Sequence, residues 1–361
     1  MTPDMGRTTT VVQNEESALM QKRRAEAVAE GTLCGLNVYV QLLLIMCFGL
    51  FEALGTAAWQ SVLFALPLGL LPVLLSRLSY QKTAPKWTLL LLLPALAFDM
   101  LLALMGVCEL SAVFVVPGTN RFLIALLTCA TVYLSLLSSG APAYARLGRL
   151  ALPFLFFSLL WCVLTSVRNM KLSNLTPVLG LGLKPTLLMA LLPLGCMWQG
   201  PLFLLMDRHK GEKAPRAYRY ILLSVGLAVA TALLTALLWP MEGFLAPMSP
   251  PKRMMILNQS SSSTATWSLL VFSWLFALFI CLGSCARGAQ RVAARFFPSR
   301  KLSWLLMLMP FLLVIWPASL GLDELAGLAI RWSPLRYVLA LLCALMTLIF
   351  GKGERACEKS A

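Results

Sequence analysis

Long apolar runs alternate with short polar connections along most of the chain. Ten runs can be placed, near residues 36–54, 57–77, 87–107, 121–138, 148–168, 184–206, 219–239, 266–286, 302–320 and 331–350. Each holds about 18 to 23 residues, enough to cross a hydrocarbon core of roughly 30 Å at about 1.5 Å per residue. The pattern predicts ten transmembrane helices, with only a tight turn at 52–59 between the first two.

The composition supports a membrane protein. Of the 361 residues, 59% are hydrophobic and only 12% are charged, whereas soluble domains carry about 25% charged residues. The alternating strands of an outer-membrane barrel are absent from the sequence. We therefore expect an all-α polytopic membrane protein, with a tail at 1–32, a ten-helix domain at 33–351 and a second tail at 352–361.

A net charge of +15 raises the possibility of a nucleic-acid partner, but its placement favours membrane topology. With the N-terminus inside, most of the 30 lysines and arginines fall in cytoplasmic connections. A minority, which includes Arg331 and Arg336, falls on the opposite side. This asymmetry predicts a multi-pass protein of the cell membrane with both termini in the cytoplasm, and no nucleic acid is needed to explain the charge.

Catalytic and cofactor motifs are missing from the sequence. Many of the ten cysteines lie inside apolar runs, where a thiol behaves as a small hydrophobe. His209 is the only histidine and sits in a basic loop, so a zinc site or a histidine-based triad has little support. Neither GxxxxGK[ST] nor GxGxxG occurs. We expect no enzyme, no cofactor and no metal.

The sixth run is crowded with residues that disfavour helix. Pro193 and Gly195 fall near its centre, and Trp198 and Gln199 follow them. Proline removes a backbone donor, and irregular backbone at membrane depth survives only inside protein or beside a wet cavity. Secondary transporters place broken helices of this kind around their substrate. An ordinary proline kink without a ligand is the alternative.

Ten runs also divide as five plus five, so the fold prediction includes an inverted repeat with a discontinuous sixth helix. The first run then occupies the position that corresponds to the sixth. It contains Gln41 and Gly49 but no proline, and the sequence leaves open whether it is broken.

Asp99 lies midway along the third run, where an isolated carboxylate is costly and usually functional. Three roles are open to it: contact with a substrate amine, proton transfer, or pairing with a basic side chain near a cavity. A neutral, protonated Asp99 hydrogen-bonded to a neighbouring helix is a fourth reading.

Several stretches together resemble one family. In "VPGTNRFLIALLTCATVYLSLLSSGAPAYARLGRLALPF" (116–154), a Pro-x-Thr opens the fourth span and an Arg-containing turn leads into the fifth; "NLTPVLGLGLKP" (174–185) precedes the sixth. The order of spans and a long loop at 240–265 complete the match. The chain is similar to the spore germination permeases, the B-subunit type of the germinant receptor, within the amino acid/polyamine/organocation transporter superfamily.

The resemblance implies a spore inner-membrane protein that senses a small germinant, such as an amino acid, together with A-type and C-type receptor subunits. The expected ligand-binding residues are Gln41, Gly49, Asp99, Pro193, Gly195, Trp198 and Gln199, with Ser273 and Trp274 of the eighth span completing the wall. The chain departs from the family pattern where Gln199-Gly200 stands in place of a frequent acidic residue. A stand-alone amino acid or cation symporter is the alternative, and an assembly subunit with a vestigial pocket is a third possibility.

Overall fold

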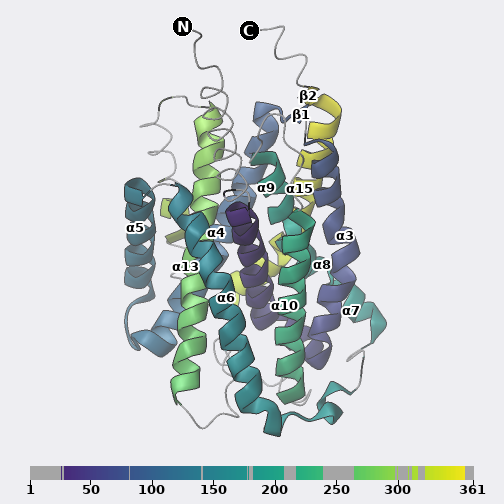
Figure 1. Ribbon diagram of the computed structural model, residues 1–361, viewed down its shortest axis with the longest axis vertical. Helices are drawn as coiled ribbons and strands as arrows, with labels where there is room; N and C mark the ends of the chain where they lie inside the picture. The colour runs from purple at the N-terminus through teal and green to yellow at the C-terminus, as the bar shows by residue number, and fades with distance from the viewer. Residues whose placement is uncertain are drawn as a thin grey trace, which may run out of the picture.

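The computed structural model is almost entirely helical. It describes residues 26, 28–80, 82–139, 141–176, 178, 182–206, 217–238, 264–296, 299, 308, 311–315 and 322–353. The loop at 240–263, His209 and most of the first tail lie outside these residues. The long helices run side by side as one bundle along the long axis of the molecule (Figure 1).

The bundle is built from long helices and shorter helical pieces. After the first helix (Val28–Ile45), the elements are α2 (Phe51–Leu54), α3 (Ala58–Leu78), β1 (Lys82–Thr83), α4 (Leu92–Leu110), α5 (Arg121–Ser139), α6 (Ala141–Ser166), α7 (Leu183–Met189), α8 (Leu191–Leu194), α9 (Gln199–Met206), α10 (Ala217–Leu238), α13 (Thr264–Phe296), α15 (Leu322–Phe350) and β2 (Lys352–Gly353). Short 3₁₀ turns at Gly55–Ala57, Lys86–Leu91, Val167–Asn169, Leu172–Leu175 and Gly195–Trp198, and π-helical turns at Met46–Leu50 and Ser111–Val115, join or interrupt them.

Within the described residues, 8 helices are long and apolar enough to cross a membrane. They correspond to the first five predicted runs and to the seventh, eighth and tenth. The sixth run is divided into α7, α8, the 3₁₀ turn Gly195–Trp198 and α9. Of the ninth run, 302–320, only 308 and 311–315 are described, and these are helical. The chain is thus an all-α polytopic membrane protein.

The first helix begins further upstream than its apolar run indicated. Residues 28–32, which we expected in the tail, are helical and continue directly into the span. Its far end widens into the π-helical turn Met46–Leu50, flanked by residues in the right-handed helical conformation, so the helix is distorted there but not unwound. Gly55, with φ 56° and ψ −127°, then makes the expected tight turn into α3.

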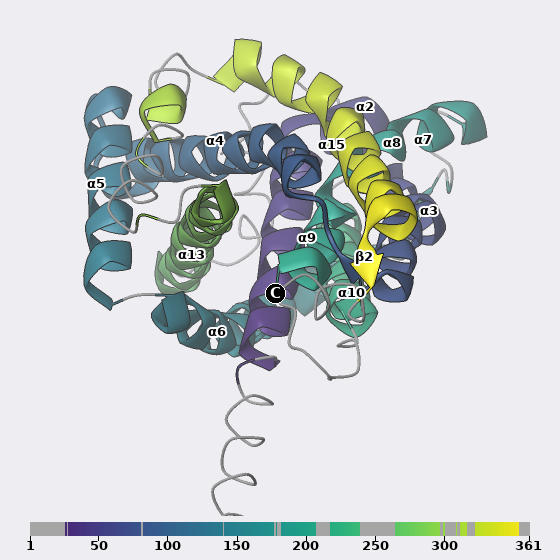
Figure 2. The same ribbon diagram turned by 90° about the horizontal axis from the view of Figure 1, so that it is seen from above.

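Seen from above, the first helix runs through the middle of the bundle (Figure 2). On one side of it α13 is surrounded by α4, α5 and α6, and on the other side α3, α9, α10 and α15 lie together. The antiparallel pairing of Lys82 with Gly353 and of Thr83 with Lys352 joins the connection after α3 to the segment after α15. These two predicted cytoplasmic segments therefore lie at the same end of the bundle.

Candidate functional site

The centre of the bundle holds a buried ion pair. Asp99 lies midway along α4, whose other residues are almost all apolar, and it is completely buried. Arg336 approaches it from the middle of α15 and is 1% exposed. Its Nη1 donates to Asp99 Oδ1. Of the roles open for Asp99, the structure therefore places it beside a basic side chain.

Further donors complete the surroundings of the carboxylate. Trp198 Nε1 donates to Asp99 Oδ2 at 2.8 Å, and Gln199 Nε2 donates to the same oxygen. Both donors stand where the sixth segment passes from its 3₁₀ turn into α9. Because charge-assisted hydrogen bonds are roughly twice as strong as neutral ones, this arrangement holds Asp99 in place from two neighbouring helical segments.

The guanidinium group is also held on several sides. Arg336 Nη1 donates to Gln41 Oε1 at 3.1 Å, and Nη2 donates to Ser333 Oγ at 3.0 Å. The Arg336 side chain lies 4.9 Å from the centre of the Phe98 ring, within cation–π range. The first helix, α4, the sixth segment and α15 thus meet at one polar cluster, defined here as Gln41, Asp99, Trp198, Gln199, Ser333 and Arg336.

The interruption of the sixth segment is packed directly against α15. Gly195 lies so close to Ser333 that a Cβ at position 195 would come within 2.1 Å of the Ser333 carbonyl oxygen. Ser333 Oγ donates to the carbonyl oxygen of Leu192 at 2.6 Å, directly before Pro193. A neighbouring helix therefore adds a hydrogen bond to the irregular backbone of the sixth segment, which in a membrane protein must be buried in protein or face a wet cavity.

The structure brings together only part of the predicted site. Gln41, Asp99, Trp198 and Gln199 belong to the polar cluster, and Pro193 and Gly195 lie next to it in the interrupted segment. Gly49 is buried further along the first helix, within the π-helical turn.

Two predicted residues of the eighth span lie elsewhere. Ser273 is within hydrogen-bonding distance of Ser158 Oγ on α6, at 3.1 Å. Trp274 lines a separate apolar pocket with Tyr39, Val40, Leu43, Leu44, Leu155, Ala277 and Leu278. The helix that contacts Asp99 in their place is α15, because Arg336 projects from it into the bundle.

Arg336 does not lie where its position in the sequence indicated. Its position near the start of the tenth run led us to assign it to the outer, water-facing side, whereas it is buried. A chemical argument from the sequence could have indicated that Arg336 is buried. A carboxylate in the middle of one span favours a cation at similar depth in another, and α15 carries one five residues into its candidate span Trp332–Phe350.

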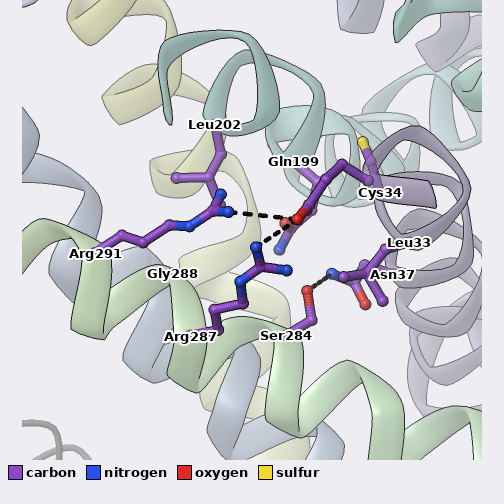
Figure 3. Close-up of a pocket in the computed structure, with 10 residues that line it drawn as sticks. Leu33, Cys34, Asn37, Gln199, Leu202, Ser284, Arg287, Gly288 and Arg291 are labelled. Atoms are coloured by element: carbon purple, nitrogen blue, oxygen red, sulfur yellow. Dashed lines mark hydrogen bonds and ion pairs between the residues drawn. The ribbon is translucent and has the colours of Figure 1, made fainter. Parts of the chain in front are cut away.

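A small polar cavity lies next to the cluster, between the first helix, α9 and α13 (Figure 3). Glu30 bridges Arg287 at 2.5 Å and Arg291 at 3.3 Å, and Asn37 Nδ2 donates to Ser284 Oγ at 2.8 Å. The cavity has a volume of about 50 Å³. Gln199 lines it and also donates to Asp99, so this side chain connects the wall of the cavity with the buried ion pair.

The cluster combines one buried anion with one buried cation and several amide, indole and hydroxyl groups. Such a set matches the two charged ends of a small zwitterion. Among the described residues no group of three or more His, Cys, Asp and Glu side chains could hold a metal ion. The guanidinium of Arg336 would also repel a metal cation at Asp99.

Solved structures with the same overall fold include a manganese transporter of Eremococcus coleocola. Its H236A mutant superposes with a TM-score of 0.54 at 14% sequence identity, covering 90% of this chain and 78% of that one. The same transporter in complex with an aromatic bis-isothiourea substituted compound gives 0.52 at 15% identity and the same coverage. At this identity the likeness establishes the fold of the chain.

No curated protein matches the sequence. The family model described as spore germination protein, however, matches residues 43–241, from the first helix to the end of α10. That region is more than half of the chain and contains Asp99, Trp198 and Gln199. The chain therefore belongs to the spore germination protein family and is a transporter-fold membrane permease.

Proposed function

We propose that this protein is the nutrient-sensing, permease-like subunit of a spore germinant receptor. It binds a small zwitterionic germinant, an amino acid in the first instance, at the polar cluster. Occupancy shifts the bundle between two conformations, and partner subunits of the A and C types pass that shift on to the release of ions from the spore.

The buried Asp99–Arg336 pair is the observation that supports this function. An amino acid carries an ammonium that fits Asp99 and a carboxylate that fits Arg336, so the ligand can replace each half of the pair with a partner of the same charge. The main cost of opening such a site is a buried charge left without a partner. A ligand that replaces both halves of an existing ion pair avoids this cost. Four helical segments meet at the cluster, so separating the pair would also change their packing.

The proposed location is the inner membrane of the spore, with both termini in the cytoplasm. The distribution of lysine and arginine supports this orientation. The pairing of β1 with β2 also supports it, because both strands belong to segments assigned to the cytoplasmic side.

Germination of spores that carry Asp99→Asn or Arg336→Gln tests the proposal. Each variant is expected to raise the half-maximal amino acid concentration at least tenfold when spores with equal membrane levels of the receptor are compared. Ser138→Ala, at an exposed position near the end of α5, is the matched control and should respond as the parent does. An unchanged response in both cluster variants at every germinant concentration would favour an assembly subunit with a vestigial pocket.

A stand-alone symporter is the second candidate, and the transporter fold favours it. Vesicles that contain this chain alone distinguish the two. The sensor is expected to bind labelled amino acid with little accumulation, whereas a symporter accumulates it in response to an ion gradient. Accumulation that depends on Asp99 would contradict the proposal that the protein is a sensor, but it would still support amino acid binding at the polar cluster.

A further inference from the structure

A third and much larger cavity lies on the flank of the bundle, away from the polar cluster. Its volume is about 450 Å³, and it is an open cavity lined by α4, α5, α6, α13 and the π-helical turn after α4. The lining residues are Val107, Ser111, Thr128, Thr131, Ser135, Tyr144, Leu147, Phe272, Leu275, Phe276, Phe279 and Ile280. In Figure 2, α5 stands at the edge of the bundle and α13 lies between it and the first helix.

The wall of the flank cavity is mainly apolar. Leu275, Phe276 and Phe279, on one face of α13, line it together with Phe272 and Ile280. Because α13 already makes all its helical backbone hydrogen bonds, this face offers dispersion contacts and no unpaired donor or acceptor.

Hydroxyl groups on the opposite wall are already used inside the protein. Thr131 Oγ1 donates to the carbonyl of Leu127 at 2.7 Å, and Ser135 Oγ donates to that of Val132 at 2.8 Å. Ser135 Oγ is also 2.5 Å from Tyr144 Oη. A buried water needs two to four polar partners. Because these hydroxyls already have partners and most of the lining is apolar, the cavity favours an apolar occupant over a cluster of waters.

The mouth of the flank cavity opens within the membrane. Its lining residues lie in, or within two residues of, four candidate spans, so its depth is that of the hydrocarbon layer. Phe272 is 57% exposed and Phe276 is 37% exposed. In the described part of the chain the cavity is therefore open to the side, towards the bilayer, and a small molecule dissolved in water would first have to enter the lipid.

We infer that this cavity is a binding site for one acyl chain of a membrane lipid. The acyl chain fills the space between α5 and α13 and supports α5. This helix also contacts the rest of the bundle through the Tyr133–Phe311 ring pair and the Arg121–Glu109 ion pair. The volume of the cavity falls within the range of about 300–1,000 Å³ that is typical of small-molecule sites. The site does not depend on germinant binding at the polar cluster.

Photo-crosslinking tests this site. The full chain is reconstituted in nanodiscs that contain a phosphatidylglycerol with a diazirine on its acyl chain, and labelled peptides are mapped by mass spectrometry. Labelling is expected to be at least fivefold higher in the α13 peptide around Phe272–Ile280 than in lipid-facing peptides of α3. Equal labelling of both peptides would overturn the proposal, because it would describe ordinary contact with bulk lipid.

A pair of tryptophan variants on α5 provides the control. Thr131→Trp places a large ring in the cavity and is expected to reduce labelling of the α13 peptide at least fivefold. Leu134→Trp, at a position that is 62% exposed and outside the cavity lining, should leave it unchanged. Equal labelling in the two variants would overturn the proposal.

A second measurement does not depend on the folding of either variant. Native mass spectrometry is expected to show that the parent protein keeps one bound lipid per protein chain after extensive delipidation. Short-chain detergent should release this lipid, and labelling of the α13 peptide should be lost at the same time. Complete loss of lipid under mild delipidation would overturn the proposal. So would a protein crosslink, in place of lipid, at Phe272–Ile280 in native membranes.

Discussion

Arg336 on α15 donates to Asp99 on α4 in the middle of the bundle, and both side chains are almost completely buried. The two residues are far apart in sequence, so their contact fixes the position of one half of the molecule against the other. In the hydrocarbon layer each charge would be costly alone, and together they form a neutral unit.

Removing one charge from this pair should cost far more stability than removing both. Asp99→Asn leaves the Arg336 guanidinium buried without its counter-ion, and we expect a loss of about 3–5 kcal/mol in the free energy of unfolding. Thermal unfolding in detergent measures it. The double variant Asp99→Asn/Arg336→Gln should recover most of the loss, since no net charge remains. A double variant as unstable as the single one would mean that the two side chains do not act as a pair.

The spans and the polar cluster were not equally accessible from the sequence. Span positions follow from local apolar length, because crossing a hydrocarbon layer is a property of one segment at a time. Asp99, Trp198 and Gln199 were also recognisable, since a carboxylate or a proline-rich interruption inside a span is unusual in itself. In the structure they lie with Gln41 in one cluster, and their role in ligand binding stays a prediction.

The positions of Arg336, Ser273 and Trp274 in the bundle could not be predicted from the sequence. Which face of a helix meets which neighbour depends on the packing of the whole bundle, and the apolar pattern of a buried span has too little asymmetry to reveal it. Arg336 was assigned to the outer side because it lies near the start of the tenth apolar run, whereas α15 begins at Leu322, well before that run. Ser273 and Trp274 were expected to complete the wall of the site, and their side chains instead contact α6 and the first helix.

The close contact between the sixth segment and α15 predicts that alanine substitution at two glycines has very different effects on stability. A Cβ at Gly195 would lie 2.1 Å from the Ser333 carbonyl oxygen, which is backbone and cannot turn aside. Gly195→Ala should therefore destabilise the protein by about 1–3 kcal/mol, the usual cost of overpacking. It should also weaken amino acid binding, because Trp198 and Gln199 follow directly. Gly226→Ala, where nothing lies within 4 Å of the added carbon, is expected to be neutral or stabilising by up to about 1 kcal/mol. Equal melting temperatures for the two variants would contradict this packing.

The ion pairs of Glu30 at the polar cavity in Figure 3 predict that substitution of this residue lowers the stability of the protein. Its carboxylate bridges Arg287 and Arg291 and thereby joins the first helix to α13. Glu30→Gln should lower the free energy of unfolding by about 1–3 kcal/mol, the usual cost of losing charged hydrogen bonds at a partly buried site. Glu26→Gln, one turn earlier and exposed, serves as control and should change it by less than about 0.5 kcal/mol. Disulfide trapping between Cys replacements on the two helices should become slower in Glu30→Gln if the bridge holds them together.

The turn between the first two spans depends on a backbone conformation that only glycine adopts easily. Gly55 has φ 56° and ψ −127°, a combination that lies outside the left-handed helical region. Gly55→Ala should cost about 1–3 kcal/mol through backbone strain. Gly55→Asn distinguishes this from ordinary left-handed strain, because asparagine tolerates the left-handed helical region but not this value of ψ. Both variants should therefore lower the melting temperature equally, as measured by thermal unfolding in detergent. If Gly55→Asn kept the stability of the parent, the turn would be left-handed helical, and the first helix would enter α3 at a different angle.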